Sequence, residues 1–213
     1  MFLIKKRYFK DIKSLNLEIL TSQFQNNYSL YGASLDFNSI NNTTQTITNN
    51  ITISDSKFIN NKAEYFGGAI YSNFENIDLS HITNTTFIGN KAYAGGAIYI
   101  HNENFTLIDE KMIKKYILNN TSESHGHNIA TKPYQIEFQS EILTDSNINL
   151  KIGDNLQLEF ELKDQFNQTV IDQSKYYDNI IIKAVIHNEE ENEYLLNEVL
   201  LTSNTCYFFK GIY

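Results

Sequence analysis

One phrase occurs twice in this chain, nearly letter for letter. FINNKAEYFGGAIY runs from Phe58 to Tyr71, and FIGNKAYAGGAIYI runs from Phe87 to Ile100. The two copies begin 29 residues apart (87 minus 58). A period of roughly 20 to 50 residues is typical of solenoids and propellers. This repeat therefore restricts the fold more than the composition does.

Two weaker copies flank this pair. With the phrase as a template, four units begin at Phe24, Phe58, Phe87 and Ile117. Each unit has an apolar residue, an asparagine three positions later, a glycine turn and a second apolar residue. The template residues are Phe24, Asn27, Gly32 and Leu35; Phe58, Asn61, Gly67, Gly68 and Ile70; Phe87, Asn90, Gly95, Gly96 and Ile98; and Ile117, Asn120, Gly126 and Ile129.

The apolar residues inside the units alternate with polar ones, as in NITI, NIDLS and FTL. A period of two predicts β-strands. No unit contains the roughly ten residues of helical periodicity that a helix-based repeat needs. We expect three short strands per unit, with turns at Gly and Asn. This pattern describes one coil of a parallel β-helix.

Stacked coils place equal template positions about 4.8 Å apart. The residues that begin the units are expected to form one inward column, and the last apolar residues a second. Burial of each is worth roughly 1.5 to 3 kcal/mol. The asparagines are expected at bends, bonded to backbone or to the next asparagine. The pairs Gly67–Gly68 and Gly95–Gly96 are expected at corners where a side chain would collide with the next coil.

The FINN and FIGN motifs, each followed by GGAI, resemble the F-x-x-N and G-G-A-[ILV] repeats of the chlamydial polymorphic outer-membrane proteins. Similar right-handed β-helix segments occur in large surface proteins of protists. The resemblance covers residues 15–130, and the outer copies depart from it with GASL and GHNI. It implies a right-handed parallel β-helix of the pectin-lyase-like type with about four coils, surface-exposed and adhesive.

A second module is expected after Pro133, which follows the last unit directly. From there short apolar strands alternate with polar turns, the pattern of an antiparallel β-sandwich with about 5 to 7 strands. Its segment with Asp164 and Asn167 resembles bacterial-type immunoglobulin-like domains. The predicted organisation of this all-β chain is thus an N-terminal extension or cap (1–14), a β-helix (15–130) and a β-sandwich (131–213). Because the chain ends inside an apolar strand, we expect it to be a truncated segment of a longer protein.

The net charge of −8 is concentrated in the second module. Residues 1–130 hold 11 acidic and 11 basic side chains, whereas residues 131–213 hold 14 acidic and 6 basic ones. Neither half offers the basic field that binding to nucleic acid requires. Cys206 is the only cysteine, so no internal disulfide forms. No stretch approaches the roughly 20 apolar residues of a membrane span.

An enzyme of the pectin-lyase-like fold is the main alternative, because parallel β-helices also host polysaccharide lyases and glycoside hydrolases. Hydrolysis needs two carboxylates about 5 to 9.5 Å apart. The acidic residues of the repeat module neither cluster nor recur at a fixed offset, so we expect no catalytic residue. The acidic residues considered as candidates are Asp36, Asp55, Glu64, Glu75 and Asp78.

Two further segments carry side chains that can bind metals. His125 and His127 in the last unit could present two imidazoles on one strand face. Without a third ligand in sequence, we expect turn or cap residues there. The acidic run Glu189–Glu193 could recruit calcium, although such runs are usually solvated. We expect neither a metal site nor a cofactor, and we expect Cys206 to be a buried apolar residue.

The tyrosines after the second apolar column offer a candidate binding ladder. If Ile70 and Ile98 point inward, Tyr71 and Tyr99 point outward and stack. An exposed aromatic strip binds sugars or protein partners, and ordinary packing between coils is the other interpretation. Nine N-x-[ST] sequons would make a secreted form a glycoprotein: Asn27, Asn41, Asn42, Asn50, Asn84, Asn104, Asn119, Asn120 and Asn167.

The expected function is therefore that of a noncatalytic extracellular or cell-surface segment, structural or adhesive, within a longer protein. Its expected partner is a surface protein or a glycan. The alternative is a carbohydrate-active enzyme, either a polysaccharide lyase or a glycoside hydrolase.

Overall fold

The computed structural model describes residues 14–38, 48–74, 77–106, 113, 115–139, 154, 158–177, 180–183 and 205–207. The chain divides into two compact units. The first is Met1–Gln135 together with Asp164–Gln168, and the second is Ile136–Lys163 together with Thr169–Tyr213. Of the predicted extension 1–14, only Ser14 is described, as the start of the first strand.

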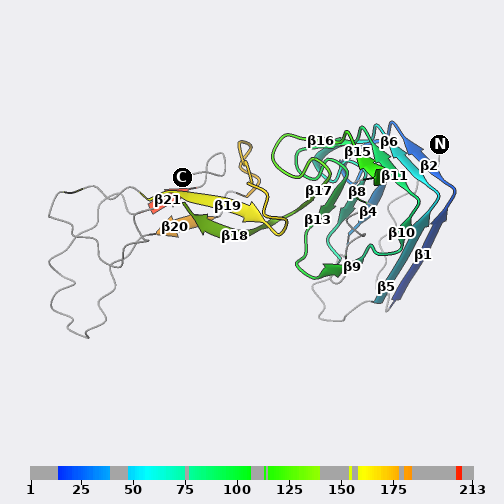
Figure 1. Cartoon of the computed structure of the whole chain (residues 1–213), viewed down its shortest axis with the longest axis horizontal. Helices are drawn as coiled ribbons and strands as arrows, with labels where there is room; N and C mark the ends of the chain where they lie inside the picture. The colour runs from blue at the N-terminus through cyan, green and yellow to red at the C-terminus, as the bar shows by residue number, and fades with distance from the viewer. Residues whose placement is uncertain are drawn as a thin grey trace. The chain divides into compact units, whose positions relative to one another are not determined.

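The first unit is a parallel β-solenoid, as the repeat predicts (Figure 1). Three of its sheets have four strands each, one strand from every repeat unit, so the chain makes about three turns from the first layer to the last. These sheets are β2 (Gln23–Gln25), β6 (Lys57–Ile59), β11 (Thr86–Ile88) and β15 (Ile117–Leu118); β3 (Tyr28–Tyr31), β7 (Lys62–Phe66), β12 (Lys91–Ala92) and β16 (Thr121–Ser122); and β4 (Leu35–Phe37), β8 (Ile70–Ser72), β13 (Ile98–Ile100) and β17 (Ile129–Thr131).

Two smaller sheets complete the coils. One joins β1 (Ser14–Leu20), β5 (Thr48–Ser54) and β10 (Ile82–Thr83), and the other joins β9 (Ile77–Asp78) and β14 (Phe105–Thr106). Between Thr48 and Ser72 the chain therefore forms four strands, one more than the three predicted per unit. The extra strand β5 contains the NITI segment, whose Ile51 and Ile53 are fully buried.

The first apolar column consists of Phe24, Phe58, Phe87 and Ile117, which pair in register across the first four-stranded sheet. The rings of Phe24 and Phe58 stack with centroids 4.8 Å apart, and those of Phe58 and Phe87 with centroids 4.6 Å apart. Phe58 and Phe87 are 0% exposed. The repeat period thus sets the ring spacing, because each turn returns the same residue to the same place one layer on.

The second column is made by Leu35, Ile70, Ile98 and Ile129, again paired in register. Both columns belong to one buried apolar core that runs through all layers. Each fully buried side chain contributes roughly 1.5 to 3 kcal/mol, and the core has no interruption between layers.

The template asparagines form a continuous hydrogen-bonded ladder inside the bend. The Asn61 N–H and its Nδ2 both donate to Asn90 Oδ1, at 3.0 and 2.9 Å. Asn61 Nδ2 also donates to the Phe24 carbonyl, and Asn90 repeats the pattern with Asn120 and Phe58. Asn61 and Asn90 are 0% exposed. These bonds satisfy backbone groups that the bend would otherwise bury without partners.

The first paired glycine, Gly67, is close to backbone of its own layer, and the second, Gly68, is close to backbone of the next layer. Gly67 has a φ of +68°, and a Cβ on it would lie 2.1 Å from the Ile70 carbonyl oxygen. A Cβ on Gly68 would lie 2.0 Å from the carbonyl oxygen of Gly96 in the next layer. Backbone atoms cannot move aside at these distances, so only glycine fits.

In the second unit the structure describes few strands. β18 (Pro133–Phe138), which starts in the first unit, neighbours β19 (Phe160–Asp164). β20 (Ile181–Lys183) pairs antiparallel with β21 (Thr205–Tyr207), with Ile182 opposite Cys206. Leu162 and Val170 are buried. The immunoglobulin-like sandwich stays a prediction, and Glu189–Glu193 lies outside the described residues.

Candidate functional site: the capped end of the solenoid

The last layer of the solenoid, β15, β16 and β17, ends the three four-stranded sheets. In a parallel ladder, alternate residues direct their N–H and C=O groups to opposite neighbours. In β17 the groups of Ile129 and Thr131 face away from β13, since the Ile98 N–H bonds to the Asn128 carbonyl. Buried groups of this kind need partners from outside the sheet.

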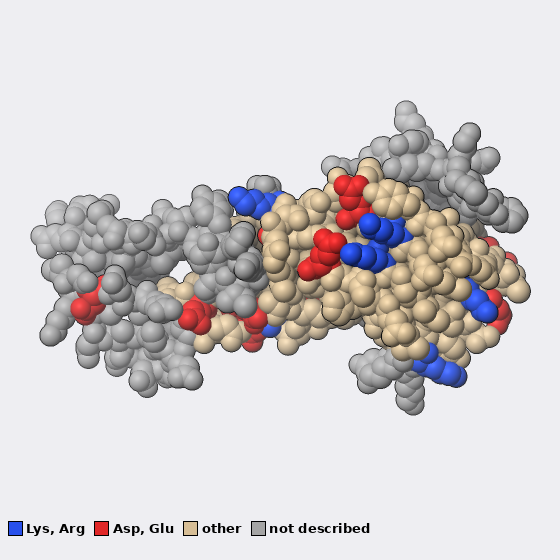
Figure 2. Space-filling model, turned by 90° about the horizontal axis from the view of Figure 1, so that it is seen from above, with Lys and Arg blue, Asp and Glu red and all other residues tan. Residues whose placement is uncertain are grey.

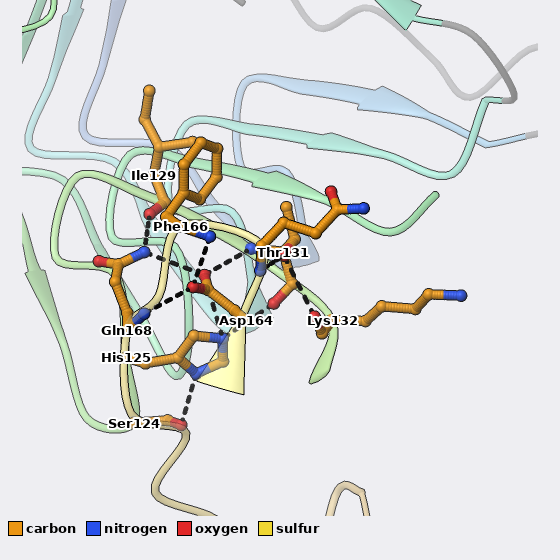
Figure 3. A network of polar contacts seen from close by, with 9 residues as sticks. Ser124, His125, Ile129, Thr131, Lys132, Asp164, Phe166 and Gln168 are labelled. Atoms are coloured by element: carbon orange, nitrogen blue, oxygen red, sulfur yellow. Dashed lines mark hydrogen bonds and ion pairs between the residues drawn. The ribbon is translucent and has the colours of Figure 1, made fainter. Parts of the chain in front are cut away.

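A segment from much later in the chain, Asp164–Gln168, supplies those partners (Figure 3). We call it the cap segment. The Thr131 N–H donates to Asp164 Oδ2 at 3.2 Å, and Gln168 Nε2 donates to the Ile129 carbonyl at 3.0 Å. The Gln165 N–H donates to Thr131 Oγ1 at 3.0 Å. Side chains therefore take the places that the backbone of a further layer would occupy.

Asp164 organises the cap segment as well as docking it. Its Oδ1 accepts the N–H groups of Phe166 and Gln168, at 2.9 and 3.0 Å. Its own N–H donates to the Gln168 carbonyl, and Asn167 takes a φ of +58° to close the turn. The Asp164 side chain is 0% exposed. A buried carboxylate is tolerated here because it accepts several hydrogen bonds.

Phe166 closes the apolar end of the solenoid. Its ring packs against the main core, with its centroid 5.8 Å from that of Phe105. The cap segment thus covers both kinds of open surface that a last layer leaves, the polar sheet edge and the apolar core.

His125 completes the polar network. Its Nε2 lies 2.8 Å from the Thr131 carbonyl oxygen, and its Nδ1 lies 2.8 Å from Ser124 Oγ. A carbonyl only accepts, so Nε2 carries the hydrogen in this contact. When the ring is neutral, Nδ1 is then the acceptor for the Ser124 hydroxyl. Asp164 Oδ2 lies 3.9 Å from Nε2, and the His125 side chain is 1% exposed.

Ser124, His125 and Asp164 are the residue types of a hydrolytic triad, but their arrangement differs from that of a triad. In a triad the imidazole bridges the nucleophile and the carboxylate. Here the Nε2 hydrogen is directed to Thr131, and the carboxylate is used by backbone N–H groups. Ser124 is 8% exposed. These contacts are those of a structural network that binds the cap segment.

The asparagine ladder has its own ending in the last layer. Asn120 Nδ2 donates to the Phe87 carbonyl and to Asn128 Oδ1, each at 3.1 Å. Asn128 therefore replaces the asparagine of a following layer. His127 accepts the Ser122 N–H at Nδ1, so the two histidines of the HGH motif serve different partners. The described residues contain no group of three His, Cys, Asp or Glu side chains that could hold a metal.

The predicted exposure of the tyrosine ladder is wrong. Tyr71 and Tyr99 do stack, with centroids 6.0 Å apart and an interplanar angle of 12°. However, they are only 7% and 0% exposed. They form a second apolar cluster with Tyr93, Ala94 and Ala130, packed against Tyr31 and Phe66. The residues of this cluster cover the two tyrosine rings. Alternation along a single strand cannot predict such a contact. Burial, followed by the charges of Tyr31 and Asp36, raises the pKa of Tyr71 to about 12.

The carboxylates of the repeat module lie apart in small local contacts. Asp55 Oδ1 accepts from Asn84 Nδ2, Glu64 Oε2 accepts from the Tyr28 hydroxyl, and Asp78 Oδ1 accepts the Ser80 N–H. Glu75 lies outside the described residues. Opposite charges are interspersed over the face shown in Figure 2. One such pair is Lys91 Nζ and Glu123 Oε1, 3.3 Å apart.

Some residues of this site were not predicted. The repeat template does not include Phe166, Gln168 or Asn128. The only indication of the turn in the sequence is an aspartate, Asp164, followed four positions later by the amide side chain of Gln168. Outside this site, in strand β3 of the first layer, Tyr28 was also not predicted. Its side chain is among the most exposed aromatics described, at 64%, with Lys62 Nζ 5.9 Å from its ring centroid.

Comparison with known proteins gives one family. No curated protein and no solved structure matches the chain. Within the residues that the structure describes, no helix is long and apolar enough to cross a membrane. Residues 55–73 and 84–101 match the family model of the Chlamydia polymorphic membrane protein repeat, which confirms the resemblance predicted from their motifs.

Proposed function

We propose that this chain is a noncatalytic, surface-associated structural segment of a larger extracellular or cell-surface protein, with a role in adhesion. The observation that carries the proposal is the match of residues 55–73 and 84–101 to a membrane protein repeat. Both segments lie in adjacent solenoid layers, where Phe58 pairs with Phe87 and Ile70 with Ile98. In this proposal the solenoid is a right-handed stalk and the second unit an immunoglobulin-like module.

The noncatalytic part of the proposal is supported by how the motif residues are used. Phenylalanine, asparagine and glycine positions all serve the coil, and the acidic residues are dispersed. A carbohydrate-active enzyme is the alternative, and a reducing-sugar release assay on acidic and neutral polysaccharides separates the two. Sustained release of sugar ends by the purified chain would reject the noncatalytic role.

Adhesion needs an exposed binding feature, and Tyr28 is the candidate. Its ring projects from the edge strand β3, and its hydroxyl donates to Glu64 Oε2 at 3.1 Å. An aromatic ring at the surface can stack against a sugar or a partner side chain. We expect binding of the purified chain on a glycan array or to immobilised surface extracts to fall in Tyr28→Ala.

Tyr134→Ala is the matched control, because Tyr134 is 56% exposed and belongs to β18. Equal binding by both variants and the unchanged chain would contradict the role of Tyr28.

The cellular location is tested separately with antibodies against the solenoid, applied to intact and permeabilised cells of the source organism. Staining only after permeabilisation would reject surface association.

A further inference from the structure

The two ends of the solenoid differ in whether other described residues cover the terminal layer. The last layer is closed by the cap segment and by Asn128, as described above. The first layer, β2, β3 and β4, provides the edge strand of each four-stranded sheet at the other end. Large apolar side chains are exposed at this end, including Leu20 at 54% and Leu30 at 50%.

Among the described residues, no strand pairs with the outer edge of β2. The Asn26 N–H donates to the Ile59 carbonyl in the second layer. Because N–H groups alternate along a strand, those of Gln23 and Gln25 face the opposite way, out of the solenoid. Within the described part of the chain, Asn27 Nδ2 donates to Asn61 Oδ1 and nothing donates to Asn27 Oδ1. The first layer therefore offers strand edges and an amide acceptor.

The two ends are chemically complementary. Inside the solenoid, the asparagine of each layer donates to Oδ1 of the asparagine in the next layer. In the last layer Asn120 donates to Asn128 instead, whereas Asn27 Oδ1 is the acceptor that a following layer would present. Phe24 and Ile117 occupy the same template position at opposite ends. A first layer placed on a last layer would continue the stacking between layers.

We propose that the cap segment Asp164–Gln168 prevents the chain from stacking head to tail on a second copy of itself. The groups that it occupies, the Ile129 carbonyl and the Thr131 N–H, are those that a further strand would use. With the cap segment displaced, the last layer of one copy accepts the first layer of the next. Such a contact joins two different surfaces and does not close on itself, so it produces linear assemblies.

The test is the mass of the full chain in solution, measured by sedimentation or light scattering over a range of concentrations. The unchanged chain is expected to show no end-to-end growth beyond its mass of 24.7 kDa. Asp164→Ala removes the acceptor for Thr131 and for the turn, so its average mass is expected to rise at least twofold with concentration. Gln168→Ala loses the bonds of its Nε2 to the Ile129 carbonyl and to Asp164 Oδ2 but keeps the bond from Thr131 to Asp164, so it is expected to show a smaller rise.

Two second-site changes identify the surface involved. Gln25→Pro removes an outward N–H from the edge strand β2 and is expected to return Asp164→Ala to the mass of one chain. Ile88→Lys changes an exposed side chain on the lateral face of β11 and is expected to leave the assembly intact. The opposite pattern, loss of assembly with Ile88→Lys only, would overturn the proposal in favour of lateral contact.

Native circular dichroism and a cooperative thermal transition are required of each variant. If Asp164→Ala loses its native spectrum, Gln168→Ala alone decides the question, because the turn around Asp164 is retained. A native Gln168→Ala chain that stays at the mass of one chain at every concentration would then overturn the proposal.

Discussion

The side chain of Asp164 accepts a hydrogen bond from the backbone N–H of Thr131, 33 residues earlier in the chain. This contact lies where a solenoid would otherwise end in an open sheet edge. Through it, five residues from the later part of the sequence complete the first compact unit. The stability of the solenoid therefore depends on residues outside its repeats.

Phe87→Ala is expected to destabilise the solenoid by about 3 to 5 kcal/mol, because the ring is fully buried between Phe58 and Ile117 and its loss leaves a cavity. Chemical denaturation gives the free energy of unfolding. Ile88→Ala is the control, since its side chain is 37% exposed and should cost under about 1 kcal/mol. Similar losses in both variants would show that the column is not continuous.

Asn90→Ala is expected to lower stability by about 2 to 4 kcal/mol, because it leaves the buried Asn61 N–H without its acceptor and removes the bond from Asn90 Nδ2 to the Phe58 carbonyl. Asn90→Asp keeps the Oδ1 acceptor but loses the Nδ2 donor. Its loss in free energy of unfolding, compared with that of Asn90→Ala, therefore separates the acceptor role of Asn90 from its donor role. Asn104→Ala, at an exposed position, should be close to neutral. A neutral Asn90→Ala would argue against the ladder.

His125→Ala should weaken the cap segment, since the Thr131 carbonyl and the Ser124 hydroxyl both lose a partner. The expected loss is about 1 to 3 kcal/mol per group left unsatisfied. Hydrogen exchange at Thr131 and Gln168 should accelerate in this variant. His127→Ala provides the comparison, because His127 is exposed and bonds only within its own layer. Unchanged exchange in His125→Ala would remove this histidine from the network.

Tyr71 should make stability fall at alkaline pH. Its pKa is raised from 10.0 to about 12 by burial first and then by Tyr31 and Asp36, so the folded state holds its proton more strongly than the unfolded state does. The resulting stability is present below the unfolded pKa of 10.0 and is lost as pH rises toward 12. Denaturation between these pH values should show a shallower decline in Tyr71→Phe. Parallel declines would contradict the assigned burial.

The solenoid could be predicted from sequence because its information is local and repeated. Phe58 and Phe87 lie at equal positions of a repeat, so a single rule, that each turn returns to the same place, predicts their pairing. The same rule predicts where Asn61 meets Asn90 and why Gly67 and Gly68 fall at a corner. The prediction of an exposed tyrosine ladder was wrong because alternation describes only one strand. It predicted correctly that Tyr99 points away from the main core, but it could not predict that Tyr93 and Phe66 cover the ring.

The repeated sequence alone was enough to specify the coils, their layer order and their inward columns. The reason is that the contacts between layers join equivalent residues of the repeat, which are separated by a nearly constant number of positions. Tertiary structure decided how the last layer ends. Asp164, Phe166 and Gln168 share no periodicity with the repeats, and their partners Ile129 and Thr131 acquire their need for hydrogen bonds only after the sheet has formed. The reason is physical: an open strand edge and an uncovered core are properties of a completed stack, so the residues that satisfy them are recognisable only in three dimensions.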